Sequence, residues 1–180
     1  MGLRYSDHLG VDHQFLVWVT SVLEEVKPLI EMLRHHEGVR HEPYRCPARL
    51  WTIGVGHVID PAHLRVPFDA RLDLPIPPGW DRTLTDAEVD SLLQQDLARF
   101  LEGVRRLCPV GLTLGRHWAL TSFAFNVGLG NLQASTLRQK HNRGEYDAAA
   151  EEFGKWNKSA GQVLRGLTLR RQDERAMYLT

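Results

Sequence analysis

The sequence has only two cysteines, Cys46 and Cys108, among its 180 residues. Two cysteines are too few for the disulfide framework that supports many small secreted domains. A single Cys46–Cys108 bridge in an oxidising compartment stays open as an alternative, because pairing cannot be deduced from sequence. With 43% hydrophobic residues, the chain can form one well-packed domain, expected in two lobes, without disulfides.

Long apolar runs are also missing. Residues 1–10 contain no apolar segment and no cleavage pattern, so we expect no cleaved secretory signal. The apolar stretch Phe15–Leu23 has nine residues and is followed by Glu24, Glu25 and Lys27, which makes it too short to span a bilayer. We therefore predict no stable membrane insertion.

A net charge is absent too, since 22 basic residues balance 22 acidic ones. The charges are unevenly distributed: residues 1–100 carry 10 basic and 15 acidic side chains, and residues 101–180 carry 12 and 7. The basic excess continues through Lys155, Lys158, Arg165, Arg170, Arg171 and Arg175. Such a face attracts an anionic polymer, either bacterial cell wall or nucleic acid. Because no nucleic-acid motif accompanies it, we expect no nucleic-acid partner.

Helical spacing of apolar residues is the commonest pattern present. Thr85 and Glu88 form a capping box before a long helix that continues past Phe100. The segment Trp118–Val127 is apolar nearly all round, which predicts a buried central helix ended by Gly128. Further helices are expected over residues 12–26, 28–37, 135–144, 146–156 and 160–179.

Residues 61–82 contain five of the nine prolines, which predicts a loop or an irregular part of a β lobe. The segment has enough apolar side chains to pack on the domain. These are Phe68, Leu72, Leu74, Ile76 and Trp80.

The stretch that begins at Glu37 carries residues of reactive type. Gly38 predicts the end of a helix at Glu37, because glycine readily takes the left-handed conformation found there. A carboxylate in a last helical turn meets unpaired carbonyls, which disfavour its charge and favour the protonated form that a general acid needs. The next segment, Leu50–Ile59, is predicted to be β structure with a bend or close backbone approach at Gly54 and Gly56.

Eight residues separate Glu37 from Cys46, and five separate Cys46 from Thr52. This spacing, embedded in E-G-x-R-x-x-x-Y and W-T-x-G-x-G-H, resembles the signature of the phage-type lysozymes, glycoside hydrolase family 24. The other matching residues are Gly38, Arg40, Tyr44, Trp51, Gly54, Gly56 and His57. In that family the middle position is usually Asp and less often Cys.

The resemblance implies an α+β, lysozyme-like fold that is mostly helical, with a small β lobe over about residues 44–59 and a cleft between the lobes. It implies a catalytic domain over residues 28–180 and leaves residues 1–27 as an N-terminal helical extension. It implies no metal and no organic cofactor.

By resemblance, Glu37 is the acid that protonates the glycosidic oxygen, and Cys46 and Thr52 position or activate the attacking water. Inverting glycosidases normally use a second carboxylate for that step. With a thiol there instead, three roles stay open for Cys46: thiolate base, water-orienting group and covalent nucleophile.

The resemblance also carries over His57, Phe125 and Asn126 as residues that contact the substrate. A core role is the alternative for Phe125, because large aromatic side chains often carry core burial. The implied reaction is inverting hydrolysis of the β-1,4 bond between N-acetylmuramic acid and N-acetylglucosamine in bacterial peptidoglycan, by a phage or prophage endolysin. The family further implies a monomer that accumulates in the host cytoplasm, is released with the help of a holin, and acts on the cell wall from the periplasm.

Three other interpretations were weighed. A zinc site would use histidines near Cys46, but three residues lie between Glu37 and His41 where the helical zinc motif has two, and Gly38 would break that helix. A wall peptidase that depends on Cys46 lacks the helix N-terminus that usually activates such a thiol, because Pro47 follows. The third is an inactive peptidoglycan-binding module with a lysozyme-like fold, supported by the Cys in place of Asp.

Overall fold

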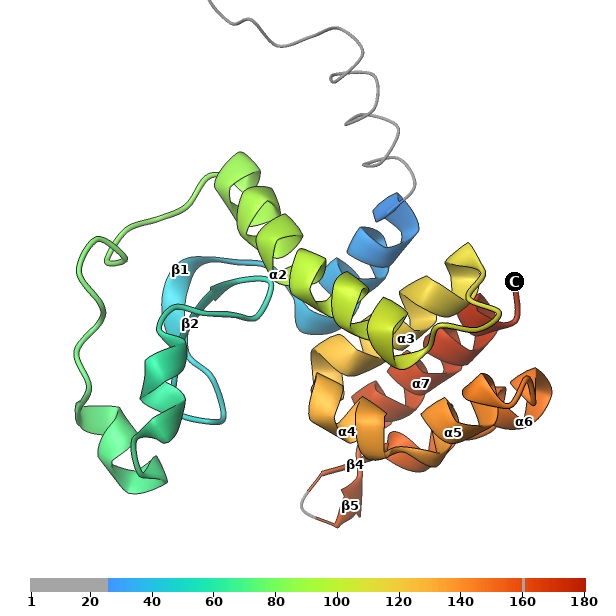
Figure 1. Ribbon diagram of the computed structural model, residues 1–180. Helices are drawn as coiled ribbons and strands as arrows, with labels where there is room; N and C mark the ends of the chain where they lie inside the picture. Colours follow the sequence, from blue (N-terminus) through green and yellow to red (C-terminus); the bar gives the residue numbers. More distant parts are fainter. Residues whose placement is uncertain (1–25, 160) are drawn as a thin grey trace, which may run out of the picture.

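The computed structural model describes residues 26–159 and 161–180, and the helix predicted to start at Asp12 lies outside them. The described chain forms two lobes joined by one long helix (Figure 1). Residues 26–37 are helical, the small lobe follows, and the remaining helices gather in the second lobe. The predicted α+β, mostly helical lysozyme-like fold is confirmed.

The small lobe contains an antiparallel sheet in the order β1-β2-β3. Its strands are β1 Arg40–Arg45, β2 Trp51–Gly54 and β3 His57–Val58. The lobe therefore starts before the predicted residue 44. The predicted segment Leu50–Ile59 is a hairpin rather than one strand, because Gly54 (φ 64°) and Gly56 (φ 73°) turn the chain in left-handed conformations.

Residues 61–82 begin with two 3₁₀ helices, η1 Pro61–Arg65 and η2 Phe68–Asp73. Trp80 packs against the core as expected, but Phe68 and Leu72 are about half exposed, so the prediction that they pack on the domain was wrong. Hydrogen bonds replace apolar burial here. Arg71 Nη1, for example, donates to the carbonyl oxygen of Ala48 at 3.1 Å.

Helix α2, Asp86–Leu107, connects the two lobes (Figure 1). Its predicted capping box is confirmed: Glu88 N donates to Thr85 Oγ1 at 3.3 Å, and Thr85 N donates to Glu88 Oε2 at 2.8 Å. Within the described residues, no helix combines the length and the apolar character needed to cross a membrane.

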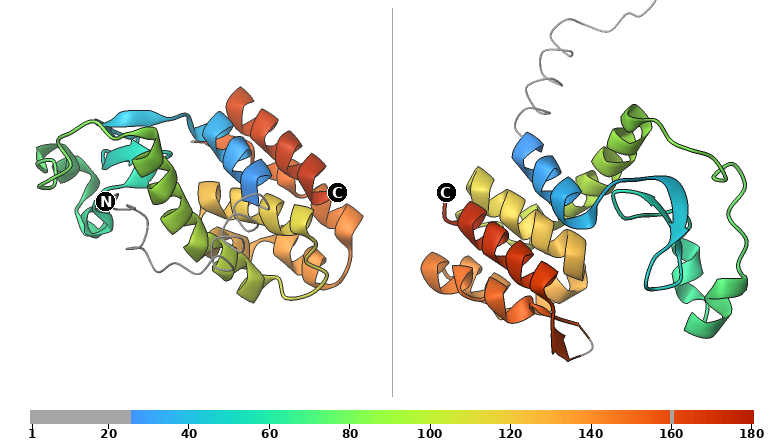
Figure 2. Two further views of the ribbon diagram at one scale, coloured as in Figure 1. Left: turned by 90° about the horizontal axis from the view of Figure 1, so that it is seen from above. Right: turned by 180° about the vertical axis from the view of Figure 1, so that it is seen from behind.

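The second lobe is built around the central helix α3, Leu114–Val127, which Gly128 (φ 92°) ends as predicted. Helix α7, Arg165–Tyr178, runs beside α3 and the N-terminal helix (Figure 2). The other elements are α4 Leu129–Ala134, α5 Thr136–Asn142, α6 Tyr146–Ala150, η3 Phe153–Trp156, β4 Lys158–Ser159 and β5 Gln162–Val163.

Two helix predictions in this lobe need correction. Residues 146–156 form two short helical elements, α6 and η3, rather than one helix, and Gly154 within the second has low helix propensity. The closing helix starts at Arg165 rather than near residue 160, because the short hairpin of β4 and β5 precedes it.

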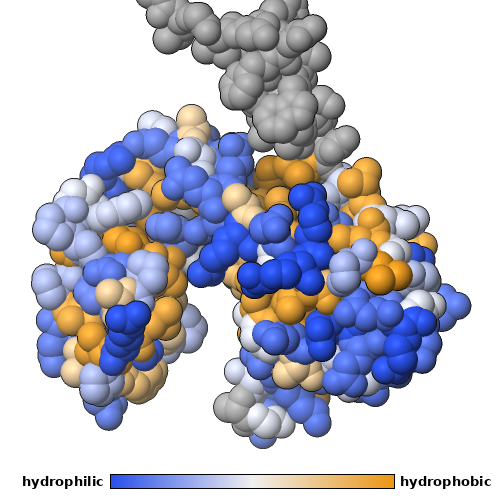
Figure 3. Space-filling model, viewed as in Figure 1, coloured by the Kyte–Doolittle hydropathy of each residue, from blue (hydrophilic) through white to orange (hydrophobic). Residues whose placement is uncertain are grey.

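The core consists of two apolar clusters. One joins the N-terminal helix, β2 and the first half of α2, and the other fills the second lobe between α2, α3, α5 and α7. Phe125 packs against both clusters, at the point where the lobes meet. On the face shown in Figure 3 the surface is hollowed between the lobes below α2, in agreement with the predicted cleft.

Candidate active site

Glu37 occupies the last residue of the N-terminal helix, where the sequence predicted it. Gly38 (φ 74°) leaves the helix and donates its N–H to the carbonyl oxygen of Arg34 at 3.1 Å. The Glu37 side chain keeps 24% of its surface exposed. The carboxylate thus lies at the end of a helix that packs on the domain through Leu29 and Leu33, and it stays partly exposed.

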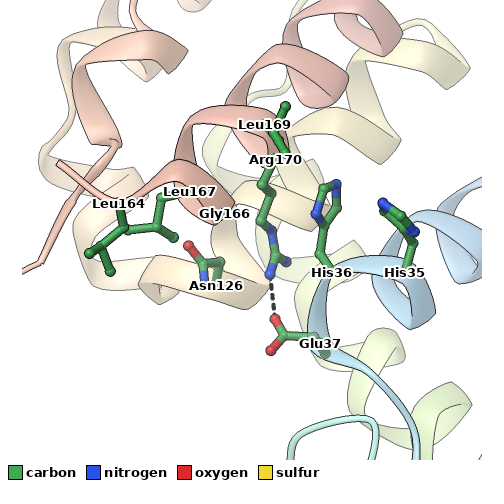
Figure 4. A pocket seen from close by; sticks show the side chains of 9 residues that line it. All are labelled: His35, His36, Glu37, Asn126, Leu164, Gly166, Leu167, Leu169 and Arg170. Atoms are coloured by element: carbon green, nitrogen blue, oxygen red, sulfur yellow. Dashed lines mark hydrogen bonds and ion pairs between the residues drawn. The ribbon is translucent and has the colours of Figure 1, made fainter.

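The Glu37 carboxylate meets a guanidinium group from α7. Arg170 Nη1 donates to Glu37 Oε1 at 2.5 Å, and Figure 4 shows this contact crossing from α7 to the N-terminal helix. Arg170 is only 3% exposed. Its other nitrogens are also bound: Nε donates to Glu174 Oε1 at 3.2 Å, and Nη2 donates to the carbonyl oxygen of Ser122 at 3.1 Å.

Arg171 is more deeply buried still, at 1% exposed. Its Nη2 donates to Glu174 Oε1 at 2.8 Å and to Asn126 Oδ1 at 3.2 Å. Its guanidinium carbon lies 5.0 Å from the ring centre of Phe123. The sequence interpretation that placed Arg170 and Arg171 on a basic solvent face was therefore wrong for both, because a buried carboxylate draws them inward.

Thr52 lies on β2 with 2% of its surface exposed. Its Oγ1 donates to the carbonyl oxygen of Leu50 at 3.1 Å, so the lone pairs of the hydroxyl are free to accept from a water molecule. On the sheet, Thr52 is paired with Tyr44 of β1.

Cys46 directly follows β1 and opens a tight turn in which Arg49 N donates to the Cys46 carbonyl oxygen at 2.8 Å. The Cys46 side chain is half-buried and Cys108 is fully buried, and both are free thiols, so the alternative of a Cys46–Cys108 disulfide is wrong. Burial raises the pKa of the Cys108 thiol to about 12, which leaves that group unreactive.

Tyr44 lies near both Cys46 and Glu37. Burial raises the pKa of its phenol, and the nearby Cys46 and Glu37 raise it further. Cys46 and Glu37 therefore both lie close enough to the half-buried Tyr44 phenol to act on its charge.

The turn between β2 and β3 also faces Glu37. A Cβ atom built on Gly56 would lie 3.8 Å from Glu37 Oε2 and 3.8 Å from Phe125 Cε1. Phe125 is half-buried, with its ring centre 5.2 Å from that of Phe100, which agrees with its core role, while its contact with substrate stays a prediction. Asn126 is exposed and lines a pocket with Glu37.

His57 has a partner of its own on α2. Its Nδ1 lies 2.9 Å from Asp96 Oδ2, and its ring stacks on Trp80 with 5.7 Å between ring centres. This contact ties the β hairpin to the connecting helix. Its predicted contact with substrate stays a prediction.

A pocket of about 440 Å³ opens beside Glu37 (Figure 4). Its walls are His35, His36, Glu37, Asn126, Leu164, Gly166, Leu167, Leu169 and Arg170. Burial and the charge of Arg170 lower the pKa of His36, so this imidazole is neutral at neutral pH. The pocket thus combines one carboxylate, a neutral imidazole and an apolar wall.

The sequence profile described as Phage lysozyme matches residues 34–174, which include Glu37, Cys46, Thr52 and the α7 arginines. The chain belongs to the phage lysozyme family.

Individual members agree with this assignment. An endolysin of Bacillus phage B103 is 37% identical over 153 residues, covering 84% of this chain and 52% of that protein, so the chain spans about half the length of this relative. An endolysin of Acyrthosiphon pisum secondary endosymbiont phage 1 is 30% identical over 151 residues, covering 82% of this chain and 92% of that one. Among solved structures, the muramidase domain of SpmX from Asticaccaulis excentricus superposes with a TM-score of 0.70 at 28% identity, covering 86% of this chain and 96% of that one.

In this member of the phage lysozyme family the histidines near the site have partners other than a metal or Cys46. His36 Nε2 lies 2.9 Å from Asp173, and His41 Nδ1 lies 2.9 Å from the carbonyl oxygen of Leu84. The part of the chain that the structure describes contains no group of three or more His, Cys, Asp or Glu side chains placed to hold a metal ion. The zinc interpretation therefore has no donor set among these residues.

The sequence interpretation missed Arg170, Glu174 and Ser122 as members of the site. A local signal did exist for two of them, because Arg170 and Glu174 stand four residues apart on one helix, where opposite charges pair. Nothing local could link them to Glu37, which lies 133 residues away in the chain.

Proposed function

We propose that this chain is a peptidoglycan hydrolase, an N-acetylmuramidase that cleaves the β-1,4 bond between N-acetylmuramic acid and N-acetylglucosamine. The observation that carries the proposal is the meeting of Glu37 with the Gly56 turn and the half-buried Tyr44 at the cleft. Relatives named endolysin and a structural neighbour named muramidase support the same reaction.

In the proposed mechanism Glu37 is the general acid. Its Oε1 accepts from Arg170, whereas its Oε2 lies toward the Gly56 turn, so Oε2 is the oxygen that carries the proton to the glycosidic bond. Water attacks the opposite face of the sugar and inverts the anomeric carbon. No metal or organic cofactor is required by these steps.

Cys46 and Thr52 would position or activate this water. The Thr52 hydroxyl has accepting lone pairs available because its proton is given to the Leu50 carbonyl. In this proposal Cys46 takes the role of the second carboxylate of an inverting glycosidase, with three chemistries open to it: thiolate base, water-orienting group and covalent nucleophile.

The first experiment is release of soluble muropeptides from purified peptidoglycan by the wild type and by Glu37→Gln, with mass analysis of the new ends. We expect new reducing muramic ends from the wild type alone. Activity retained by Glu37→Gln would contradict the assignment. Cleavage at peptide bonds would favour a Cys46-dependent peptidase, and tight wall binding without cleavage would favour an inactive binding module.

A second pair of variants tests Cys46. Cys46→Asp should keep substantial activity, because a carboxylate can accept a proton from water at the same position. The activity of Cys46→Ala should fall about 100-fold or more, which is the lower end of the effect of removing a general base. Full activity of Cys46→Ala would remove the thiol from the mechanism and leave water activation to Thr52.

We also propose, from the family, that the protein is a monomer that accumulates in the host cytoplasm and reaches the wall with the help of a holin. Timing of lysis in cells that express it with and without a holin tests this route. Lysis at the same time in both would contradict it.

A further inference from the structure

Glu174 is a fully buried carboxylate with no direct contact to the cleft. Three donors converge on its Oε1: Ser122 Oγ at 2.8 Å, Arg171 Nη2 at 2.8 Å and Arg170 Nε at 3.2 Å. Burial raises the pKa of Glu174, while the charges of Arg171 and Arg170 and the Ser122 hydrogen bond act in the opposite direction. The pKa of Glu174 is raised overall, but two guanidinium groups and a hydroxyl all donate to one oxygen, an arrangement that a carboxylate accepts, and on this geometry we assign Glu174 as the carboxylate.

The geometry extends this carboxylate's influence to Glu37. Arg170 bridges the two acids, with Nε on Glu174 and Nη1 on Glu37. The Ser122 carbonyl oxygen fixes the third nitrogen at 3.1 Å. A planar guanidinium bound along all three nitrogens has no freedom to turn, so the position of Glu37 Oε1 depends on Glu174.

The balance of charges also makes Glu37 depend on Glu174. Arg170 and Arg171 carry two positive charges, and among the described residues the carboxylates paired with them are Glu37 and Glu174, so Glu174 is the one that keeps its negative charge when Glu37 is protonated. Without Glu174, protonated Glu37 would leave two uncompensated guanidinium groups in a buried site, which is strongly unfavourable. Removal of Glu174 therefore favours the ionised form of Glu37 over the acid.

We propose that Glu174 is a positioning residue for Glu37, which holds Arg170 against the Glu37 carboxyl and balances its charge while Glu37 carries the catalytic proton. This inference rests on the proposed function, in which Glu37 is the general acid.

Other ionisable groups lie near Glu37 or near the groups around it. His35, His36, Tyr44, Arg170 and Arg171 lie near Glu37, Cys46 lies near Tyr44, and Asp173 is bound to His36. The pKa of Tyr44 is raised and that of His36 is lowered, which moves both titrations away from neutral pH. All of these groups are shared by the wild type and a Glu174 variant, so a difference between the two profiles reports on Glu174.

The test is the pH dependence of kcat on purified peptidoglycan for the wild type and Glu174→Gln. In Glu174→Gln we expect the alkaline limb of the kcat profile, which reports the loss of the Glu37 proton, to move to lower pH by about one unit, the order of effect of one nearby charge. We also expect kcat to fall while KM changes little, since Glu174 does not touch substrate. Glu152→Gln is the matched control, because Glu152 is also a buried carboxylate, bound by Lys140 and Lys155 away from the pocket.

A limb that stays in place in Glu174→Gln, with only a lower Tm like that of Glu152→Gln, would overturn the inference. If Glu174→Gln does not fold, Glu174→Asp carries the test. The shorter carboxylate keeps the charge and loses its longest contact, to Arg170 Nε, so kcat should fall about tenfold with the limb unmoved. Wild-type kcat in a folded Glu174→Asp variant would overturn the inference.

Glu37→Gln in the same assay separates this inference from the proposed function. An inactive Glu37→Gln together with an unmoved limb in Glu174→Gln would refute the role of Glu174 alone. An active Glu37→Gln would refute the proposed function itself.

Discussion

Replacing Thr52 with valine separates a catalytic role of its hydroxyl from a structural one. Thr52 is buried on β2, and its Oγ1 donates to the Leu50 carbonyl oxygen at 3.1 Å. Valine keeps the branched shape and removes only the hydrogen-bonding group. The stability cost and the catalytic cost of this change can therefore be predicted independently.

The stability cost is small. One hydrogen bond contributes about 1 kcal/mol net to the free energy of unfolding. The Leu50 carbonyl oxygen also accepts the N–H of Cys46 at 3.1 Å, so Thr52→Val leaves no unsatisfied acceptor there. We expect a loss of about 1 kcal/mol or less, which in a chain of this length lowers Tm by about 2–4 °C.

The catalytic cost is larger. If the Thr52 hydroxyl holds or activates water, Thr52→Val should lose about 100-fold or more in kcat. Thr52→Ser keeps a hydroxyl and should retain most of the activity, which makes it the control. Muropeptide release and thermal unfolding would be measured on the same preparations.

Two results would refute this reasoning. Wild-type turnover by folded Thr52→Val would remove the hydroxyl from the mechanism. A fall in Tm of more than about 10 °C would mean that the local hydrogen bonds were counted wrongly, because a loss of that size corresponds to several kcal/mol.

Two predictions concern stability. Asp96→Asn removes the charge that faces His57 Nδ1 at 2.9 Å. Because both side chains are partly exposed, we expect the free energy of unfolding, measured in urea, to fall by about 1.5 kcal/mol, near the lower end of the range for charged hydrogen bonds. A fall in the activity of the folded variant would instead indicate that His57 contacts substrate. Hydrogen bonds from Arg82 and Thr85 lower the pKa of Glu88 from 4.5 to about 2, so its contribution to stability is complete above pH 4.5 and is lost as the pH falls towards 2. Glu88→Ala should therefore flatten the decline of Tm in that range, and an unchanged decline would contradict this.

Local chemistry allowed much of the fold to be predicted from sequence. The capping box of Thr85 and Glu88 and the helix end at Gly128 depend on residues a few positions apart, and both were confirmed. The spacing of Glu37, Cys46 and Thr52 predicted a site within one short stretch, and Glu37 does line the pocket, while the roles of the three residues stay predictions.

Long-range pairing explains what the sequence did not reveal. Arg170 and Arg171 look like surface charges in a basic segment, and their burial depends on partners such as the buried Glu174 and Ser122, the latter 48 residues from Arg170. In the small lobe, hydrogen bonds from Arg71 to backbone carbonyls hold residues 61–74 in place. Arginine bonded to carbonyl oxygens leaves no periodic signal in a sequence.

The glycine turn beside Glu37 shows how backbone conformation serves the site. Gly56 has φ 73°, and a Cβ there would lie 3.8 Å from both Glu37 Oε2 and Phe125 Cε1, which is ordinary contact distance. Space alone would therefore admit alanine, and it is the left-handed conformation that favours glycine at this turn. Because Gly56 has no side chain, the space beside Glu37 Oε2 is left open. Because Oε1 is occupied by Arg170, Oε2 on this open side is the oxygen to which the proposed mechanism assigns the catalytic proton.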